Sequence, residues 1–166
     1  DSLVLLGRVS RLLAHQNDTD GLSAQQKATI KKSVLRILQS RKSQEQERVA
    51  SLFSRLAESE DKEIINNLLK SSSPRVRTEG VRSILRCDAS VKKHFLPDLV
   101  ERLDAPDLYE RDLALYVIRQ IKGEKATNLL PEREFQQQAN RIKSWWVDYK
   151  GKTNSAVSVE SSVRAD

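Results

Sequence analysis

Two stretches of the chain, IINNLLKSSSPRVRTEGVRSIL at residues 64–85 and LVERLDAPDLYERDLALYVI at residues 99–118, decide the fold. When Ile65 of the first stretch is laid on Leu99 of the second, the other apolar residues also coincide and Arg77 falls on Arg111. Each stretch predicts a short helix, a turn that contains proline, and a longer helix. One such helix pair cannot bury its own apolar face, so a repeat of this length predicts a stack of pairs.

The repeated unit resembles a HEAT repeat. Its signature is a short helix ending in Leu, a turn of Asp, Pro or Ser, and a longer helix with an Arg followed by a small residue three positions on. The better match is LPDLVERLDAPDLYERDLALYVIRQIKG, and Val76 and Arg77 stand at the usual Val-Arg position of the other unit. Glu110 replaces that Val in the later unit, which is a departure from the pattern. The resemblance covers residues 63–122, with the best repeats at 63–87 and 96–122.

This resemblance implies an all-α fold, an α-solenoid of antiparallel helix pairs stacked with a right-handed turn. It also implies that Arg77 and Arg111 are ladder residues, which pair with acidic side chains in the turns of a neighbouring repeat. Planar guanidinium groups suit such bidentate pairing. Asp104 and Asp107 are the candidate partners.

Helical periodicity continues outside the two repeats. It predicts helices at about 2–15, 24–39 and 43–58, the last two begun by capping boxes, Ser23 with Gln26 and Ser43 with Gln46. A final helix is expected at 132–149, where it would cap the open end of the stack. We therefore expect a single domain over residues 1–150, followed by a flexible tail at 151–166, which lacks large side chains.

Composition narrows the functional classes. The chain has 166 residues and a net charge of +6, and no run of 18 apolar residues predicts a membrane span. Cys87 is the single cysteine, and His15 and His94 lack a metal-ligand spacing, so we expect no disulfide, no metal and no cofactor. Because the chain begins at Asp1 and contains no Met, we expect a processed or excised piece of a longer protein. The compartment stays open, with a soluble cytoplasmic location favoured over an exported one.

The sequence carries none of the familiar catalytic motifs: no glycine-rich phosphate loop, no Gly-x-Ser-x-Gly and no His-Glu-x-x-His. No catalytic residue is assigned, and we expect a protein that is not an enzyme. A catalytic group assembled only in space stays open.

The adjacent tryptophans of RIKSWWVDYKGK have two interpretations. Trp146 continues an apolar stripe with the helix positions before it, so we expect it in the core. Trp145 lies about 100° round the helix from its neighbour. It either packs on the stem of Arg141 or the preceding loop, or serves as an anchor for a partner protein, since Trp is enriched at interface hot spots.

Two further surfaces are candidates for binding. The predicted helix at 74–87 carries three arginines on its outer face, and tyrosines occupy two of the three matching positions in the later repeat. These candidate partner-binding residues are Arg75, Arg82, Arg86, Tyr109 and Tyr116. Interfaces enrich Arg and Tyr, so this face is either a protein-binding surface or a solvated one.

The second surface is basic. Residues 1–42 hold eight Lys or Arg and three Asp, so most of the net charge lies there. The candidate phosphate-binding residues are Lys27, Lys31, Lys32 and Arg36, with Arg41 and Lys42 beside them. Clustered cations can neutralise phosphates, but no aromatic residues interleave them and no base-reading group accompanies them. A solvated charged face is the alternative.

These features favour a non-enzymatic protein–protein interaction or scaffold module, whose partner is another protein of unknown identity. The alternative is a nucleic-acid-binding protein that uses the basic N-terminal helices. It follows from the resemblance, because some HEAT-like proteins are DNA glycosylases that pair a cationic groove with tryptophans and a catalytic carboxylate. A lyase or chaperone for a bound chromophore rests on the fold resemblance alone.

Overall fold

The computed structural model describes residue 7 and residues 23–39, 43–125 and 130–163. Every secondary-structure element in these segments is helical, which confirms the predicted all-α class. The helices are α2 (Ala24–Leu38), α3 (Ser43–Leu56), α4 (Lys62–Leu69), α5 (Pro74–Arg86), α6 (Ala89–His94), α7 (Leu96–Glu101), the 3₁₀ turn η2 (Arg102–Asp104), α8 (Leu108–Ile121) and α9 (Glu132–Val163). The helix predicted at 2–15 lies outside the described residues, apart from Gly7.

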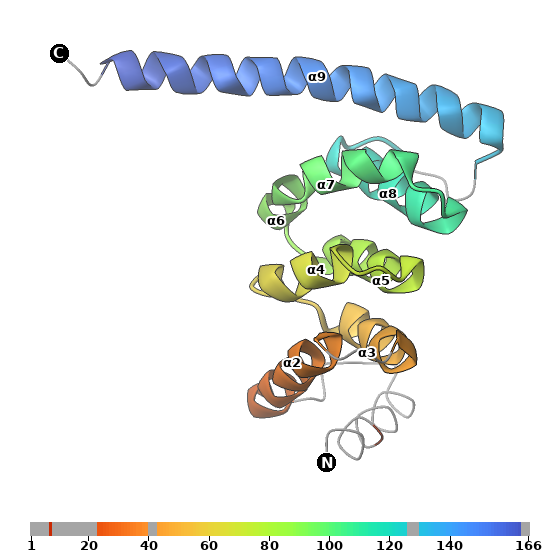
Figure 1. The fold of residues 1–166 in the computed structure, drawn as a ribbon. Coiled ribbons are helices and arrows are strands. Elements are labelled where there is room, and N and C mark those ends of the chain that lie inside the picture. Colours follow the sequence, from red (N-terminus) through yellow and green to blue (C-terminus); the bar gives the residue numbers. More distant parts are fainter. Residues whose placement is uncertain (1–6, 8–22, 40–42, 126–129, 164–166) are drawn as a thin grey trace.

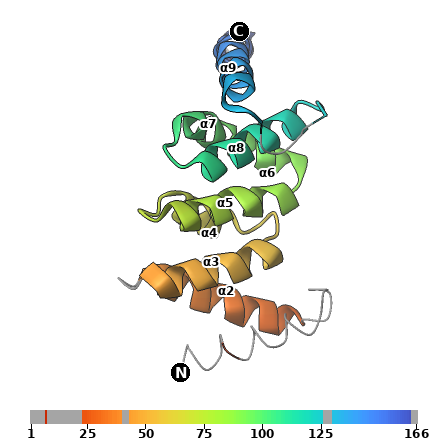
Figure 2. The same cartoon turned by 90° about the vertical axis from the view of Figure 1, so that its right-hand side faces the viewer.

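The helices lie in successive layers (Figures 1 and 2). At one end α2 packs on α3, in the middle α4 packs on α5, and the third layer joins α7 to α8. Helix α5 contacts α3 on one side and α8 on the other, so the longer helices follow one another along the stack. The long helix α9 lies across the far end, where it contacts α7 and α8.

The helix bounds follow the offset between the two sequence repeats. Helices α4 and α7 begin at positions 62 and 96, and helices α5 and α8 begin at positions 74 and 108, so both helices of the pair recur at one and the same spacing. Paired apolar positions are buried in both layers, as at Ile65 and Leu99. The small residues Gly80 and Ala114 are paired in the same way and are both buried. A Cβ atom built on Gly80 would lie 3.0 Å from Leu68 Cβ, so α4 and α5 approach closely there.

One continuous apolar core runs through the layers, from Ile30 in α2 to Ile142 in α9. Three phenylalanines are almost completely buried along it, Phe53, Phe95 and Phe135. Burial of this kind contributes about 25 cal/mol per Å² of apolar surface, so packing between layers stabilises helices that are individually short.

Of the two predicted capping boxes, the first is confirmed. Ser23 Oγ accepts a hydrogen bond from the Gln26 backbone, and the Gln26 side chain accepts one from the Ser23 backbone. The second stays a prediction, because the side chain of Ser43 lies outside the described residues; Gln46 Nε2 donates to the Leu38 carbonyl at 2.9 Å. That bond satisfies a carbonyl at the C-terminal end of α2 and links it to α3.

The last helix is longer than predicted. The predicted end at residue 149 is wrong, since α9 continues to Val163 and its C-terminal part extends past the layered helices (Figure 1). The segment after Lys150 contains no Pro, and Gly151 lowers helix stability by only about 1 kcal/mol relative to Ala. Flexibility of this segment in solution stays a prediction.

Candidate functional site

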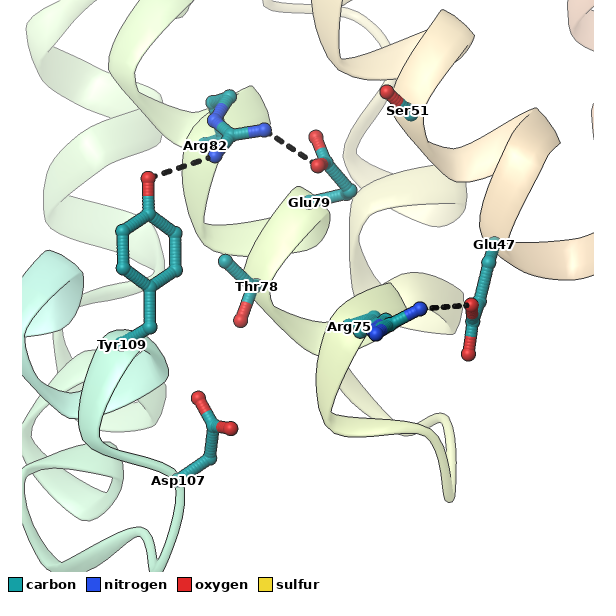
Figure 3. A pocket seen from close by; sticks show the side chains of 8 residues that line it. All are labelled: Glu47, Ser51, Arg75, Thr78, Glu79, Arg82, Asp107 and Tyr109. Atoms are coloured by element: carbon teal, nitrogen blue, oxygen red, sulfur yellow. Dashed lines mark hydrogen bonds and ion pairs between the residues drawn. The ribbon is translucent and has the colours of Figure 1, made fainter.

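A groove of about 390 Å³ crosses three layers of the stack. It is lined by side chains of α3, α5 and α8 and by the residue that caps α8 (Figure 3). The lining residues are Glu47, Ser51, Arg75, Thr78, Glu79, Arg82, Asp107 and Tyr109. Because no single helix pair supplies these groups, the groove exists only when the layers are stacked.

The two arginines of the groove are held by acidic and aromatic neighbours. Arg82 donates from Nη1 to Glu79 and from Nη2 to the Tyr109 hydroxyl at 3.0 Å, with its guanidinium carbon 5.9 Å from the Tyr109 ring centroid. Arg75 Nη1 lies 3.4 Å from Glu47 Oε2, but the Arg75 side chain is 84% exposed. An exposed pair at that distance is weak, so Arg75 is the more easily displaced of the two.

Serine hydroxyls fix the two glutamates between layers. Ser54 Oγ donates to Glu79 Oε2 at 2.6 Å, and Ser73 Oγ donates to Glu47 Oε1 at 3.0 Å. The first bond joins α3 to α5, and the second joins α3 to Ser73, the residue just before α5. The carboxylates are therefore positioned by the fold, and charge-assisted hydrogen bonds of this kind are stronger than neutral ones.

Thr78 and Asp107 differ from the other lining groups, because each has an unused hydrogen-bonding atom. Thr78 is 4% exposed, and its Oγ1 has no hydrogen-bond partner among the described residues. Asp107 Oδ1 caps α8 by accepting from the Glu110 backbone at 2.8 Å. Its second oxygen, Oδ2, makes no hydrogen bond in the described part of the chain, and Figure 3 shows the carboxylate pointing into the opening.

The structure brings three of the six predicted partner-binding residues together, and the sixth, Trp145, lies on α9. Arg75, Arg82 and Tyr109 line the groove. Arg86 is exposed at the end of α5 and does not line it, and Tyr116 lies two turns further along α8, where its hydroxyl accepts from Gln120.

Of the other lining residues, Glu79 was expected beside the three arginines and Asp107 only as a ladder partner, whereas Glu47, Ser51 and Thr78 were not predicted. Asp107 could have been found from its place before an apolar helix, with Glu110 three residues later, which is the spacing of an N-cap. Glu47 and Ser51 gave no comparable signal, because α3 lies outside the two matching repeats.

The ladder arginines pair with other acids than predicted. Arg77 donates to Glu110 through Nε at 2.9 Å and through Nη2 at 2.8 Å, and its Nη1 donates to two turn carbonyls. This hydrogen-bonded pairing raises the pKa of Arg77. Asp107 is a helix cap and Asp104 pairs with Lys143 at 2.5 Å, so neither is the hydrogen-bonded ladder partner.

A second arginine shares Glu110. Arg102 Nε lies 3.5 Å from Glu110 Oε1, while the rest of its guanidinium donates to the carbonyls of Asp98 and Leu69. Burial lowers the pKa of Arg102. Arg111 repeats the arrangement one layer on, with an ion pair to Glu132 at the start of α9.

The predicted basic surface is partly neutralised. Lys27 and Lys31 both contact Glu58 at 2.7 Å, and Lys31 also contacts Asp61 at 2.8 Å. Hydrogen bonds from Lys27 and Lys31 lower the pKa of Glu58 to about 2. Burial acts to lower the pKa of Lys31, but its bonds to Asp61 and Glu58 prevail and raise it.

Of the remaining predicted phosphate ligands, Lys32 and Arg36 are exposed. Arg41 and Lys42 lie outside the described residues. Two of the four candidate cations therefore have carboxylate partners inside the protein, which leaves fewer charges for a phosphate backbone.

The tryptophans form an aromatic cluster with Tyr149 at the edge of the core. The ring centroids of Trp146 and Tyr149 are 5.5 Å apart and those of Trp145 and Tyr149 are 5.4 Å apart. Trp146 is partly buried and packs against the core, so its predicted place on the core face of α9 is confirmed in part, although the fully buried stripe ends at Ile142. Trp145 packs against the core edge under Lys122, whose Nζ lies 4.8 Å from the ring centroid.

Other site chemistry is sparse in the described segments. They contain no group of three or more His, Cys, Asp or Glu side chains arranged to hold a metal ion. Among the same residues, no helix is both long and apolar enough to cross a membrane. Cys87 is buried, and burial together with the nearby Asp61 raises its pKa to about 11, so its thiol is a poor nucleophile.

Most polar groups of the groove are fixed by one another, whereas Thr78 Oγ1 and one oxygen of Asp107 have no hydrogen-bond partner among the described residues. No family model matches the chain, and no curated protein or solved structure matches it either.

Proposed function

We propose that the chain is an α-solenoid of stacked antiparallel helix pairs with HEAT-like repeats. The equal offsets of both helices between the second and third layers support this proposal. So does the placement of Arg77 and Arg111, each of which reaches an acid in the next layer along the stack. Chains of this type use the surfaces that their layers share for binding.

The proposed function is protein–protein interaction through the groove, as a binding or scaffold module. The observation that carries it is one groove built by α3, α5 and α8 together. Tyr109, which lines the groove, is 51% exposed, and its neighbour in the sequence, Leu108, is 60% exposed, although both are large side chains that are commonly buried. Tyr with Arg at a partly apolar rim is the composition that protein interfaces favour.

Nucleic-acid binding is less well supported. The ion pairs of Lys27 and Lys31 with Glu58 would have to break before these lysines could contact phosphates. The tryptophan cluster lies on α9, at the opposite end of the stack from α2 (Figure 1). Catalysis on a flipped base would need both features in one site.

Photocrosslinking tests the interaction module. The photoreactive residue p-benzoylphenylalanine replaces Tyr109 in one preparation and Glu101 in another, and each protein is illuminated in an extract of the source cells. Glu101 is exposed on α7, in the same layer but away from the groove lining, so it is a matched control. We expect a discrete adduct with one protein at position 109 and none at 101. No adduct at 109, or equal labelling at both positions, contradicts the proposed function.

A further inference from the structure

The groove contains an unsatisfied hydroxyl that the stack itself does not need. Thr29 and Ser83 donate to the backbone carbonyl four residues earlier, as helical hydroxyls commonly do. Thr78 is also helical, but its Oγ1 is buried and bonds to nothing among the described residues. A buried hydroxyl without a partner lowers stability, so its position in the groove points to a ligand atom.

The charges around this hydroxyl favour a cation. Three carboxylates and two guanidinium groups line the groove, which makes it locally negative in a chain of net charge +6. Arg82 is tied to Glu79 and Tyr109, whereas Asp107 keeps one oxygen without a hydrogen bond in the described part of the chain. Figure 3 places Thr78 between Tyr109 and Arg75, with Asp107 beside the same opening.

The aromatic wall suits the stem of a long basic side chain. Tyr109 is half exposed, and Arg82 already lies over its ring at 5.9 Å, which shows that the ring tolerates a guanidinium. Lysine and arginine bury their methylene stems on such surfaces while their charged heads reach polar groups.

We propose that the groove binds one lysine or arginine side chain from a peptide segment of the partner protein. Asp107 neutralises its charge, Thr78 Oγ1 accepts a hydrogen bond from its head group, and Tyr109 covers its stem. Arg75 is then a competitor, because it brings a like charge to the same opening and occupies Glu47. This inference rests on the proposed interaction function and specifies the chemistry of the partner.

Amide NMR of the full chain tests it with single-residue probes. The probes are N-acetyl-lysine methylamide and N-acetyl-arginine methylamide, with the norleucine and glutamate equivalents as controls. We expect saturable shifts at residues 75–82 and 107–110 with the basic probes, at a dissociation constant of roughly 1–10 mM for ligands so small. Norleucine, which has the lysine stem without its charge, should bind at least about fivefold more weakly.

Three variants separate the contributions. Asp107→Asn keeps a good helix cap while removing the charge, and should weaken lysine binding about fivefold. Thr78→Val is isosteric and should weaken binding while leaving the unfolding midpoint unchanged or higher. Arg75→Gln should strengthen lysine binding about twofold by removing the competing cation. An acidic partner would give the opposite sign for Arg75→Gln.

Equal shifts with norleucine and lysine, or tighter binding of the glutamate probe, overturn the proposal. So does the absence of shifts with every probe. If Tyr109 still crosslinks a partner in that case, the groove is an interface that takes no basic side chain, and the proposed function survives. If the basic probes bind but no crosslink forms, the interaction module fails while the cation site stands.

Discussion

Arg77 in α5 and Glu110 in α8 form a bidentate ion pair that joins the second layer of the stack to the third, and Glu110 is 1% exposed. In the alignment of the two repeats Glu110 takes the place of Val76, which is completely buried. The departure from the repeat pattern therefore has a physical role: it supplies the buried acid that two arginines share.

Breaking this pair should be costly. Glu110→Gln would remove the hydrogen-bonded carboxylate of Arg77 and leave Arg102 with only the longer pair to Asp98, and breaking a buried pair destabilises by about 3–5 kcal/mol. We expect a loss of about 3 kcal/mol in the free energy of unfolding, measured by urea denaturation. Glu132→Gln, which removes the exposed partner of Arg111, is the matched control and should change the free energy of unfolding much less. Equal losses of unfolding free energy in both variants would show that the buried ion pair stabilises the fold no more than the exposed one.

Gly80 tests how tightly α4 and α5 are packed. Alanine raises helix propensity by about 1 kcal/mol, which alone would stabilise α5. A Cβ at this position, however, meets Leu68 Cβ and Leu69 Cδ2 at 3.0 Å each, so these buried neighbours must shift by a few tenths of an ångström. We expect Gly80→Ala to destabilise by about 1–3 kcal/mol in thermal and urea unfolding.

The matched site in the next layer is the control for this variant. Ala114→Gly removes a methyl group from the equivalent position and should cost about 1 kcal/mol through lost helix propensity. If Gly80→Ala proves more stable than the natural chain, the close approach of α4 and α5 is not limiting.

The cluster of Glu58 with two lysines should make stability depend on pH. The folded-state pKa of Glu58 is about 2, below its ordinary value of 4.5, so its contribution is present above pH 4.5 and is lost as the pH falls toward 2. We expect the natural chain to exceed Glu58→Gln in unfolding free energy at pH 6, and the difference to shrink steadily between pH 4.5 and 2. Glu63→Gln, an exposed acid on α4, should show no such pH-dependent difference. A constant difference across this range would contradict the assignment.

Much of the fold was predictable, because it depends on local patterns. The apolar spacing at 64–85 and 99–118 predicted both the helix type and the offset between layers, and Ser23 indicated the start of α2. Pairs of residues that contact each other between layers were not predictable in the same way. Glu110 and Arg102 lie apart from Arg77 in sequence, and only the stacking of α8 on α5 brings them together.

The candidate site was predictable in part for the same reason. Arg75 and Arg82 lie on α5, and Tyr109 lies at the matching face of α8, one repeat later. Because the two helices pack side by side, the repeat spacing placed these three residues near one another. Glu47 comes from α3, which does not follow the repeat spacing, and its contact with Arg75 depends on tertiary packing. Trp146 is only partly buried, because periodicity gives the face of a helix but not the residue at which its burial becomes incomplete.

Trp145 should contribute to packing, since its ring lies on the core edge beneath Lys122. We expect Trp145→Ala to lower the free energy of unfolding by about 2 kcal/mol, combining a half-buried ring with the loss of a cation–π contact of about 0.5–1 kcal/mol. Val147→Ala, on the exposed side of α9, is the control and should change it by less than about 0.5 kcal/mol. An unchanged unfolding curve for Trp145→Ala, together with lost crosslinking at position 109, would show that the Trp145 ring binds the partner and does not stabilise the fold.

Cys87 reports on opening of the stack. Its side chain is 4% exposed, and a pKa of about 11 leaves only a small fraction of thiolate at pH 8. Labelling by an aromatic disulfide reagent at pH 8 should therefore be at least about 100-fold slower in the folded chain than in urea, where the thiol recovers its ordinary pKa and becomes accessible. Glu110→Gln should accelerate labelling roughly in proportion to its loss of stability if the layers unfold together. Labelling that is unaffected by Glu110→Gln would mean that the α5–α6 turn, where Cys87 lies, opens on its own and independently of the ion pair between α5 and α8.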